Sequence, residues 1–294
     1  MTRSLVTILA MPKPFQGHIG IIQRNAITSW TKLFPRPDIF LFGEEPGTAE
    51  IAAELQLGHL HNIQRNELGT PLLDDLIKRA KETTDTPLLC YVNSDIILLQ
   101  AFQEAIAAVH ERLPQFLAVT HRWEIDLPTP LDFKSDQRLH LGLLPPGLPG
   151  HHTAIDVFVF TRDMYVDVPP FLIGRAWFDQ WLIKDALLHG LPVVDITRVA
   201  RAIHQKHDYA HITGGQHGAY GGEEAQRNLD IYGGVPHAFT LLNSTHELLP
   251  NRTIAPLRYR REKFHVQQWL WRNLVQRTAP LRKRLGLSRG QQAQ

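Results

Sequence analysis

Apolar runs that alternate between strand spacing and helix spacing constrain the fold of this chain more than any other feature. Residues 5–11, 38–42 and 87–92 are largely apolar runs of strand length, which suits strands buried in a sheet. In residues 19–33 the apolar positions recur every three or four residues, which is the spacing of one helix face. Strands that alternate with helices favour parallel pairing, with helices on both faces of the sheet. We therefore predict a doubly wound α/β fold with a mainly parallel central sheet.

The same patterns continue along the chain. They predict helices at 48–57, 70–81, 101–113 and 177–188, and strands at 116–120, 155–160 and 192–196. Residues 128–150 are rich in Pro, Gly and Leu and are predicted to form a long loop. Seven glycines between 214 and 234 indicate a mobile loop region around a short helix at 223–231. We predict one catalytic domain over 1–256, followed by a basic tail at 257–294.

The tail carries most of the positive charge of the chain. Residues 257–294 contain ten Lys or Arg and one Glu, although the formal net charge of the whole chain is +2. With Trp269 and Trp271, the tail suits an amphipathic helix on an anionic membrane surface. A solvated tail and a helix packed on the acidic body are the alternatives. No nucleic-acid-binding motif accompanies the charge, so we do not expect nucleic acid as a partner.

Cysteine content and hydropathy indicate the cellular compartment in which we expect the protein. The single cysteine, Cys90, excludes an internal disulfide and fits a reducing environment. No apolar run approaches the roughly 20 residues that cross a bilayer, and the run at 5–11 has no signal-peptide cleavage site. We expect a cytoplasmic protein, with the tail as its contact with the inner face of the membrane if it binds one.

Asn93, Ser94 and Asp95 directly follow the predicted strand at 87–92. Open α/β sheets bind ligands beyond the carboxyl ends of their strands. A carboxylate there can hold a hard divalent cation, and the cation can bridge the two phosphates of a nucleotide diphosphate. Asp95 is therefore our candidate metal ligand. The alternative is that Asn93 and Asp95 only form a turn and cap the next segment.

A second acid, Asp179, lies between Trp177 and Trp181, with Arg175 just before them. Aromatic faces stack on sugar rings, and a partly desolvated carboxylate can act as a general base toward a hydroxyl. In the alternative interpretation, Asp179 caps the helix that runs to Leu188, and the two tryptophans fill the core.

Three histidines follow the apolar stretch that ends at Ile203, namely His204, His207 and His211. With Asp208 they could complete a metal shell or contact phosphate. Their spacing also allows a zinc site, but no His-Glu-x-x-His motif or cysteine partner supports one. Histidines that are merely hydrogen-bonded in a loop are the remaining alternative.

Taken together, these stretches resemble nucleotide-sugar-dependent glycosyltransferases of the GT-A type, and among them the family-2-like enzymes of bacteria and plants. The resemblance covers most of residues 5–250. It rests on Pro14-Phe15, Ile22-Gln23-Arg24-Asn25-Ala26, Asn66-Glu67-Leu68-Gly69-Thr70-Pro71-Leu72, Tyr91-Val92-Asn93-Ser94-Asp95, Pro130-Leu131-Asp132-Phe133, Ile155-Asp156-Val157-Phe158-Val159-Phe160, Trp177-Phe178-Asp179-Gln180-Trp181 and Ile203-His204-Gln205-Lys206-His207-Asp208-Tyr209. It implies a GT-A-like (Rossmann-like) fold.

The resemblance also implies roles for individual residues. Asn93, Ser94 and Asp95 match the Asp-x-Asp motif that binds metal and diphosphate, and Asp179 matches the acid that activates the acceptor. His204 or His207 matches a late histidine of the metal shell. Arg24 is implied to meet the nucleotide phosphates. The run Gly43-Glu44-Glu45, with Glu44 as the candidate site residue, is implied to face the base or ribose. The substrate-binding candidates are Trp123, Asp132, Asp156, Arg175, Trp177 and Trp181.

Two positions depart from the family pattern. Asn93 replaces the first acid of the motif, so one anionic ligand is missing. Asp179 lacks the acidic neighbour that often precedes the base.

The predicted function is transfer of a sugar from a nucleotide diphosphate sugar to a hydroxyl of a glycan or lipid-linked acceptor, with Mn²⁺ or Mg²⁺ at Asp95. A non-catalytic protein that binds carbohydrate or nucleotide sugars is one alternative. A sugar nucleotidyltransferase is another, although it would have a Gly-rich, Arg-containing loop after the first strand, where this chain has Met11-Pro12-Lys13-Pro14-Phe15-Gln16-Gly17.

Overall fold

The computed structural model describes residues 4–133, 144–207, 215–234 and 238–257. Its strands are β1 (Val6–Ala10), β2 (Asp38–Phe42), β3 (Gly58–Leu60), β4 (Leu88–Val92), β5 (Ile96–Ile97), β6 (Leu117–Ile125), β7 (Gly147–Pro149), β8 (Ile155–Thr161), β9 (Val193–Asp195), β10 (Ala202–Gln205), β11 (His246–Leu248) and β12 (Ile254–Pro256). Its helices are α1 (Gly17–Thr31), α2 (Thr48–Leu55), α3 (Leu73–Thr83), α4 (Gln100–His110), α5 (Phe178–Leu188), α6 (Gly215–Gly221) and α7 (Glu223–Tyr232). Except for Leu257, the predicted tail lies outside the described residues, as do Asp208 and His211.

One sheet runs through the molecule in the order β12-β11-β9-β6-β8-β4-β1-β2-β3. The strands β3, β2, β1 and β4 pair in parallel, and so do β6, β9 and β11. Strand β8 lies antiparallel between β4 and β6 and joins these two parallel parts. The α/β prediction is confirmed. The antiparallel direction of β8 differs from the predicted mainly parallel pairing. Parallel neighbours need a crossover connection, usually a helix, whereas the described part of the connection from β6 to β8 contains only the short β7.

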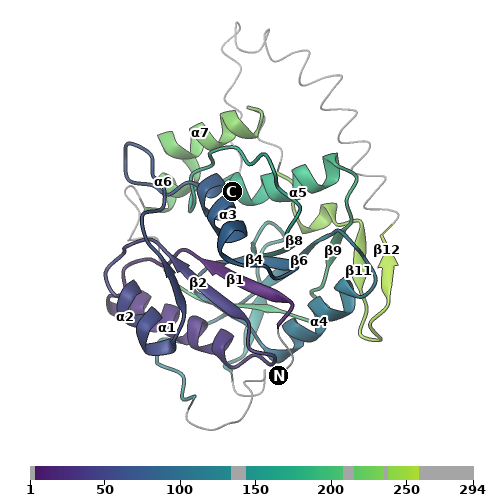
Figure 1. Cartoon of the computed structure of the whole chain (residues 1–294), viewed down its shortest axis with the longest axis horizontal. Helices are drawn as coiled ribbons and strands as arrows, with labels where there is room; N and C mark the ends of the chain where they lie inside the picture. The colour runs from purple at the N-terminus through teal and green to yellow at the C-terminus, as the bar shows by residue number, and fades with distance from the viewer. Residues whose placement is uncertain (1–3, 134–143, 208–214, 235–237, 258–294) are drawn as a thin grey trace, which may run out of the picture.

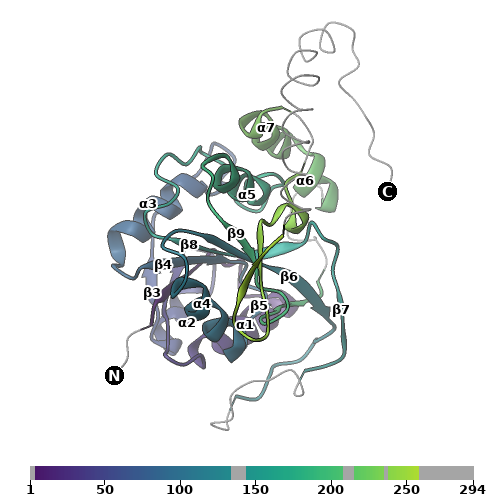
Figure 2. The same ribbon diagram turned by 90° about the vertical axis from the view of Figure 1, so that its right-hand side faces the viewer.

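Helices cover both faces of this sheet (Figures 1 and 2). Side chains of α1, α2 and α4 form one buried cluster with alternate residues of the strands, such as Ile8. Side chains of α3 and α5 form a second cluster on the other face with the intervening residues, such as Leu9. Successive strand residues point to opposite faces, and every residue of β1 and β4 is buried, so these two strands are covered on both sides.

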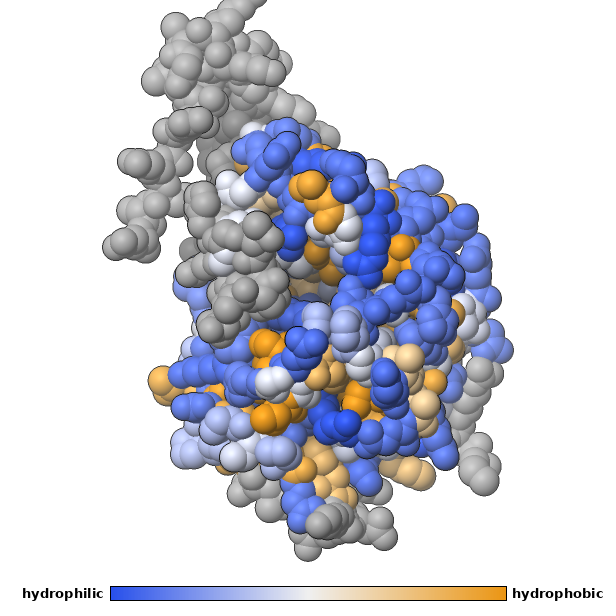
Figure 3. All heavy atoms as spheres, turned by 90° about the vertical axis from the view of Figure 1, so that its left-hand side faces the viewer, coloured by the Kyte–Doolittle hydropathy of each residue, from blue (hydrophilic) through white to orange (hydrophobic). Residues whose placement is uncertain are grey.

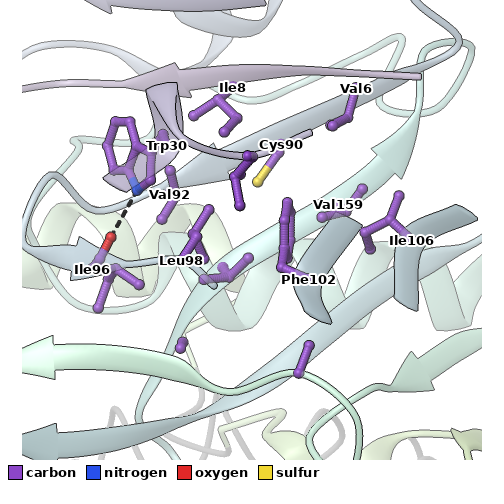
Figure 4. Close-up of a cluster of buried hydrophobic side chains, with 14 of the residues drawn as sticks. Val6, Ile8, Trp30, Cys90, Val92, Ile96, Leu98, Phe102, Ile106 and Val159 are labelled. Atoms are coloured by element: carbon purple, nitrogen blue, oxygen red, sulfur yellow. Dashed lines mark hydrogen bonds between the residues drawn. The ribbon is translucent and has the colours of Figure 1, made fainter. Parts of the chain in front are cut away.

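Helix α1 is fixed against the segment that follows β4. The fully buried Trp30 donates a hydrogen bond from Nε1 to the carbonyl of Ile96 at 2.8 Å (Figure 4). One residue earlier on α1, Ser29 Oγ accepts a hydrogen bond from the backbone N–H of Leu98 at 3.1 Å. These contacts hold the chain immediately after Asp95 in place.

Some local expectations need correction. The predicted loop at 128–150 contains β7, which pairs with β6, and the glycine-rich region at 214–234 contains two helices, α6 and α7. The face shown in Figure 3 is largely hydrophilic, with hydrophobic side chains in small separate groups. No helix in the described ranges combines the length and apolar character that crossing a membrane requires.

Candidate active site

A cleft of about 370 Å³ opens at the carboxyl ends of β1 and β4. The strand order reverses at this point, because β2 and β3 extend the sheet on one side of β1 while β4 lies on the other. Ligands of open α/β sheets bind at such switch points. Lys13, which follows β1, and Asn93, Ser94 and Asp95, which follow β4, all line the cleft.

Asp95, His204 and His207 form a cluster whose candidate ligand atoms all lie within 4.8 Å of one another. His207 Nε2 is 3.0 Å from Asp95 Oδ2, and the two imidazole rings are 5.2 Å apart. Among the described residues, this is the group of three or more acidic, His or Cys side chains that is close enough to hold a metal. The structure thus brings together the three residues that the sequence analysis proposes as metal ligands.

The electrostatics of this cluster fit a divalent cation. Asp95 Oδ1 and His204 Nδ1 are buried and have no hydrogen-bond partner in the described part of the chain. Burial raises the pKa of Asp95, but the hydrogen bond with His207 and the positive charges of neighbouring side chains outweigh it and hold that pKa well below its usual range. Burial also lowers the pKa of His204. An ionised carboxylate and a neutral imidazole are the forms that bind metal.

The buried amide side chains of Gln205 and Asn25 link this cluster to helix α1. In β10, His204 lies opposite Ile96 of β5, next to Asp95. The neighbouring Gln205, fully buried, donates from Nε2 to the carbonyl of Asp95 at 3.1 Å and to that of Ile22 at 2.8 Å. Its Oε1 accepts from Asn25 of α1 at 2.9 Å. Strand β10 is therefore tied both to α1 and to the strand end that carries the carboxylate.

Asn93 contacts a different acid. Its Nδ2 donates to Asp156 Oδ1 at 2.8 Å, and Arg122 lies 3.4 Å from the other oxygen of Asp156. Asp156 is the second residue of β8 and is 9% exposed, and all three side chains line the cleft. Asn93 therefore serves as a donor to a second carboxylate on the cleft wall.

Asp179 is the second residue of α5 and lines the same cleft. The helix begins after Trp177, whose backbone N–H donates to Gln180 Oε1 at 2.9 Å. Asp179 Oδ1 is shielded from solvent, with no partner among the residues that the structure describes. Burial, reinforced by the charge of Asp156 and opposed by backbone N–H groups at the start of α5, raises the pKa of Asp179 to about 7. This carboxyl can exchange a proton near neutral pH.

Arg175 also reaches the cleft, from the loop before α5. Its guanidinium contacts Glu224 Oε2 of α7 at 2.6 Å, and Asn66 Nδ2 donates to the other oxygen of Glu224 at 2.7 Å. Glu224 of α7 therefore links Arg175 to the loop around residue 66 at the rim of the cleft.

Several sequence candidates lie away from the cleft lining. Arg24 is exposed, and its guanidinium lies 2.5 Å from the carboxylate of Glu54. Glu44 is also exposed, and its carboxylate lies 3.9 Å from the imidazole of His61. The next residue, Glu45, lines the cleft instead and contacts Arg65 at 2.7 Å. Its Oε2 is buried without a partner among the described residues.

The aromatic candidates are packed against other side chains. Trp181 is 8% exposed and contacts Phe171 and Tyr165 in the core. Trp177 packs on Tyr232, and the guanidinium of Arg201 lies over the Trp123 ring at 4.1 Å. Asp132 is exposed in the segment after β6. None of these four candidates, all of them described, lines the cleft.

Lys13 and Arg122 also line the cleft, although neither is among the candidates predicted from the sequence. For Lys13 a signal exists, because it lies two residues after the end of the predicted strand at 5–11. Arg122 lies within β6, and only the pairing with β8 places it beside Asp156. No local pattern marks that residue.

No protein-family model matches the sequence, and no curated protein matches it. The fold is similar to the mannosyltransferase PcManGT from Pyrobaculum calidifontis in complex with GDP-Man and Mn²⁺, at 10% identity and a TM-score of 0.42. That match covers 69% of this chain and 57% of the other.

Two further matches cover less of the chain. S. aureus TarS 1-349 in complex with UDP-GlcNAc is 12% identical over 41% of this chain and 35% of the other, with a TM-score of 0.32. M. tuberculosis glucosyl-3-phosphoglycerate synthase is 11% identical over 41% and 45%, with a TM-score of 0.28. The chain thus spans about a third to somewhat over half of these solved structures.

Proposed function

We propose that this protein transfers a sugar from a nucleotide diphosphate sugar to a hydroxyl acceptor. The proposal is carried by two groups that line one cleft at the switch point of the sheet. The first is the buried cluster of Asp95, His204 and His207, and the second is the separate carboxyl of Asp179 with its raised pKa. The first group suits a cation that offsets diphosphate charge, and the second suits proton transfer from a hydroxyl.

Asp179 would accept the proton of the acceptor hydroxyl. The acceptor oxygen then forms a bond to the anomeric carbon as the bond from that carbon to the diphosphate oxygen breaks. The electron pair of the broken bond leaves with the nucleoside diphosphate. We propose a single displacement that inverts the anomeric carbon. A base whose pKa lies near 7 is matched to proton abstraction at neutral pH.

Asp95, His204 and His207 would hold the divalent cation, which when bound supplies positive charge to the diphosphate leaving group. Two of these three donors are imidazoles, whereas Mg²⁺ prefers oxygen ligands and retains much of its water. Of the two candidate cations, this donor set favours Mn²⁺.

The other residues of the cleft would position the substrates. The carboxylates of Glu45 and Asp156 can accept hydrogen bonds from hydroxyls of the ribose or sugar, and Arg122 and Arg175 can donate to them. The acceptor would be a hydroxyl of a glycan or of a lipid-linked molecule, and residues 257–294 would attach the protein to an anionic membrane surface. Vesicle sedimentation of the full chain and of a chain ending at Pro256 tests the attachment.

A thermal-shift screen tests the proposal. UDP-, GDP- and dTDP-sugars are added with Mn²⁺ or with EDTA, and a donor that binds the folded state raises the Tm. We expect one donor class to raise the Tm with Mn²⁺, and Asp95→Asn to abolish that rise. Asp167→Asn, on an exposed loop after β8, is the matched control and should behave as wild type.

The outcomes separate the candidate functions. Release of nucleoside diphosphate with an acceptor supports the transferase. A donor that binds but is never consumed with any acceptor would identify a nucleotide-sugar-binding protein instead. If no nucleotide sugar shifts the Tm, the proposal is wrong.

A further inference from the structure

Lys13 is held in the cleft by constraints on its own backbone. It lies between Pro12 and Pro14 in the segment from β1 to α1, and a residue before proline is restricted to extended conformations. Its N–H donates to Gln23 Oε1 at 2.7 Å, and its carbonyl accepts from Gln23 Nε2 at 2.8 Å. Gln23 is 1% exposed. This buried amide clamps both polar groups of the Lys13 backbone and so fixes where its side chain starts.

The side chain of Lys13 extends to the metal cluster. Its Nζ lies 3.8 Å from Asp95 Oδ2, and the side chain is 32% exposed. The other cationic side chains that line the cleft, Arg122 and Arg175, each contact at least one carboxylate at 2.9 Å or less. Lys13 has the looser contact, and a flexible stem lets its ammonium move toward a bound anion.

The charges of the cluster show why a second cation is needed. Metal-bound histidines are neutral, so Asp95 is the one anionic ligand of the cluster, and Asn93 adds no charge. A divalent cation would therefore leave the site with a single net positive charge. The diphosphate of a nucleotide sugar carries one negative charge on each phosphate. The ammonium of Lys13 supplies the positive charge that is still lacking.

We propose that Lys13 is a diphosphate-binding residue, whose Nζ leaves Asp95 and contacts a diphosphate oxygen when the donor binds. This inference rests on the proposed donor class, since it names the part of the donor that Lys13 contacts. It predicts effects of opposite sign for two ligands. Replacing Lys13 by Met removes a charge-assisted hydrogen bond to the anion, but it also removes a positive charge from beside the metal site.

Binding of inorganic pyrophosphate and of Mn²⁺ to the full chain tests this inference. Calorimetry measures pyrophosphate in the presence of Mn²⁺, and paramagnetic resonance of free Mn²⁺ measures the metal alone. We expect Lys13→Met to weaken pyrophosphate binding about tenfold, while Mn²⁺ binding without pyrophosphate stays equal or becomes tighter. Lys13→Arg should bind pyrophosphate within about threefold of wild type. Lys32→Met, an exposed lysine after α1, is the matched control.

Three results would overturn the inference. The first is pyrophosphate binding by Lys13→Met within twofold of wild type. The second is a joint loss of Mn²⁺ and pyrophosphate binding, which would give Lys13 a purely structural role. The third is a wild-type chain that binds no pyrophosphate with Mn²⁺. The two proposals can fail separately. If no donor is ever turned over, but Lys13→Met weakens pyrophosphate binding and leaves Mn²⁺ binding unchanged or tighter, the proposed transferase function is wrong and the role of Lys13 is supported.

Discussion

Replacing Asp179 by Asn should stabilise the fold at alkaline pH while it removes the proposed base. The pKa of Asp179 is raised from 3.8 to about 7, chiefly by burial, so the folded state holds its proton more tightly than the unfolded chain does. The contribution of Asp179 to the unfolding free energy of the wild type therefore falls as pH rises from about 4 to about 7, and above that pH it stays constant. An Asn at this position cannot ionise, so the variant lacks this loss.

The size of the effect follows from the shift. Each unit of pKa difference corresponds to about 1.4 kcal/mol, so a shift of this size corresponds to about 4 kcal/mol. Asp179 borders the cleft, however, and water there screens part of the charge. We expect Asp179→Asn to gain about 2 kcal/mol in unfolding free energy relative to wild type at pH 8, and less than half of that at pH 5.

Urea denaturation at pH 5, 6.5 and 8 with EDTA present measures this difference. Asp167→Asn is the control, and its difference from wild type should not change over this range. The diagnostic quantity is the change with pH, because a constant offset reports only the exchange of one side chain for another. An Asp179→Asn curve that stays parallel to wild type from pH 5 to pH 8 would refute the raised pKa.

Turnover gives an independent check of the same residue. A general base contributes a factor of about 100 to 10,000, so Asp179→Asn should lose at least about 100-fold in kcat. Wild-type kcat/KM should rise with pH up to about 7, as the base ionises in the free enzyme. Activity within a few-fold of wild type in Asp179→Asn would place the base elsewhere.

Three further predictions concern the residues around the metal cluster. Asn93→Asp should not tighten Mn²⁺ binding, because the new carboxylate would face Asp156 where the amide now donates at 2.8 Å; urea denaturation at pH 8 should show a loss of about 1–3 kcal/mol that shrinks at pH 5. Gln205→Leu leaves two buried carbonyls without their donor, so we expect a loss of about 2 kcal/mol or more in denaturant unfolding, together with weaker Mn²⁺ binding because the carbonyl of Asp95 is one of the two. Mn²⁺ should support donor binding at lower concentration than Mg²⁺ in the thermal-shift assay, and equal potency would argue against imidazole ligands.

The features that sequence predicted best depend on residues that are close together along the chain. The local spacing of apolar residues predicts the order of strands and helices, and most of these elements appear where they are predicted. Asp95 lines the cleft because it lies three residues after the end of β4, and the end of a buried strand can be recognised without any knowledge of its neighbours.

Other features depend on pairing between distant segments. His207 approaches Asp95 only because β10 pairs with β5, and those strands are about a hundred residues apart in the sequence. After β2 the chain turns at Gly43, with a φ of +91°, and this left-handed residue decides that Glu45 and not Glu44 faces the cleft. Residue spacing alone contains no information about that turn.

Asn93 shows how the same residue takes on a different meaning once its contacts are known. As a sequence feature it is the missing acid of a metal motif, which suggests a weakened site. In the fold its amide donates to Asp156, and a carboxylate at that position would face another carboxylate instead. The second negative charge of the site is thus carried by Asp156, on the cleft wall and paired with Arg122, while Asp95 serves the cluster with two imidazoles. A shell with fewer anions attracts a cation less strongly, but it also repels a diphosphate less. Because Asn93 binds Asp156 and not the cluster, the proposed metal site would keep Asp95 as its single anionic ligand, and Lys13 would further favour the binding of an anionic diphosphate.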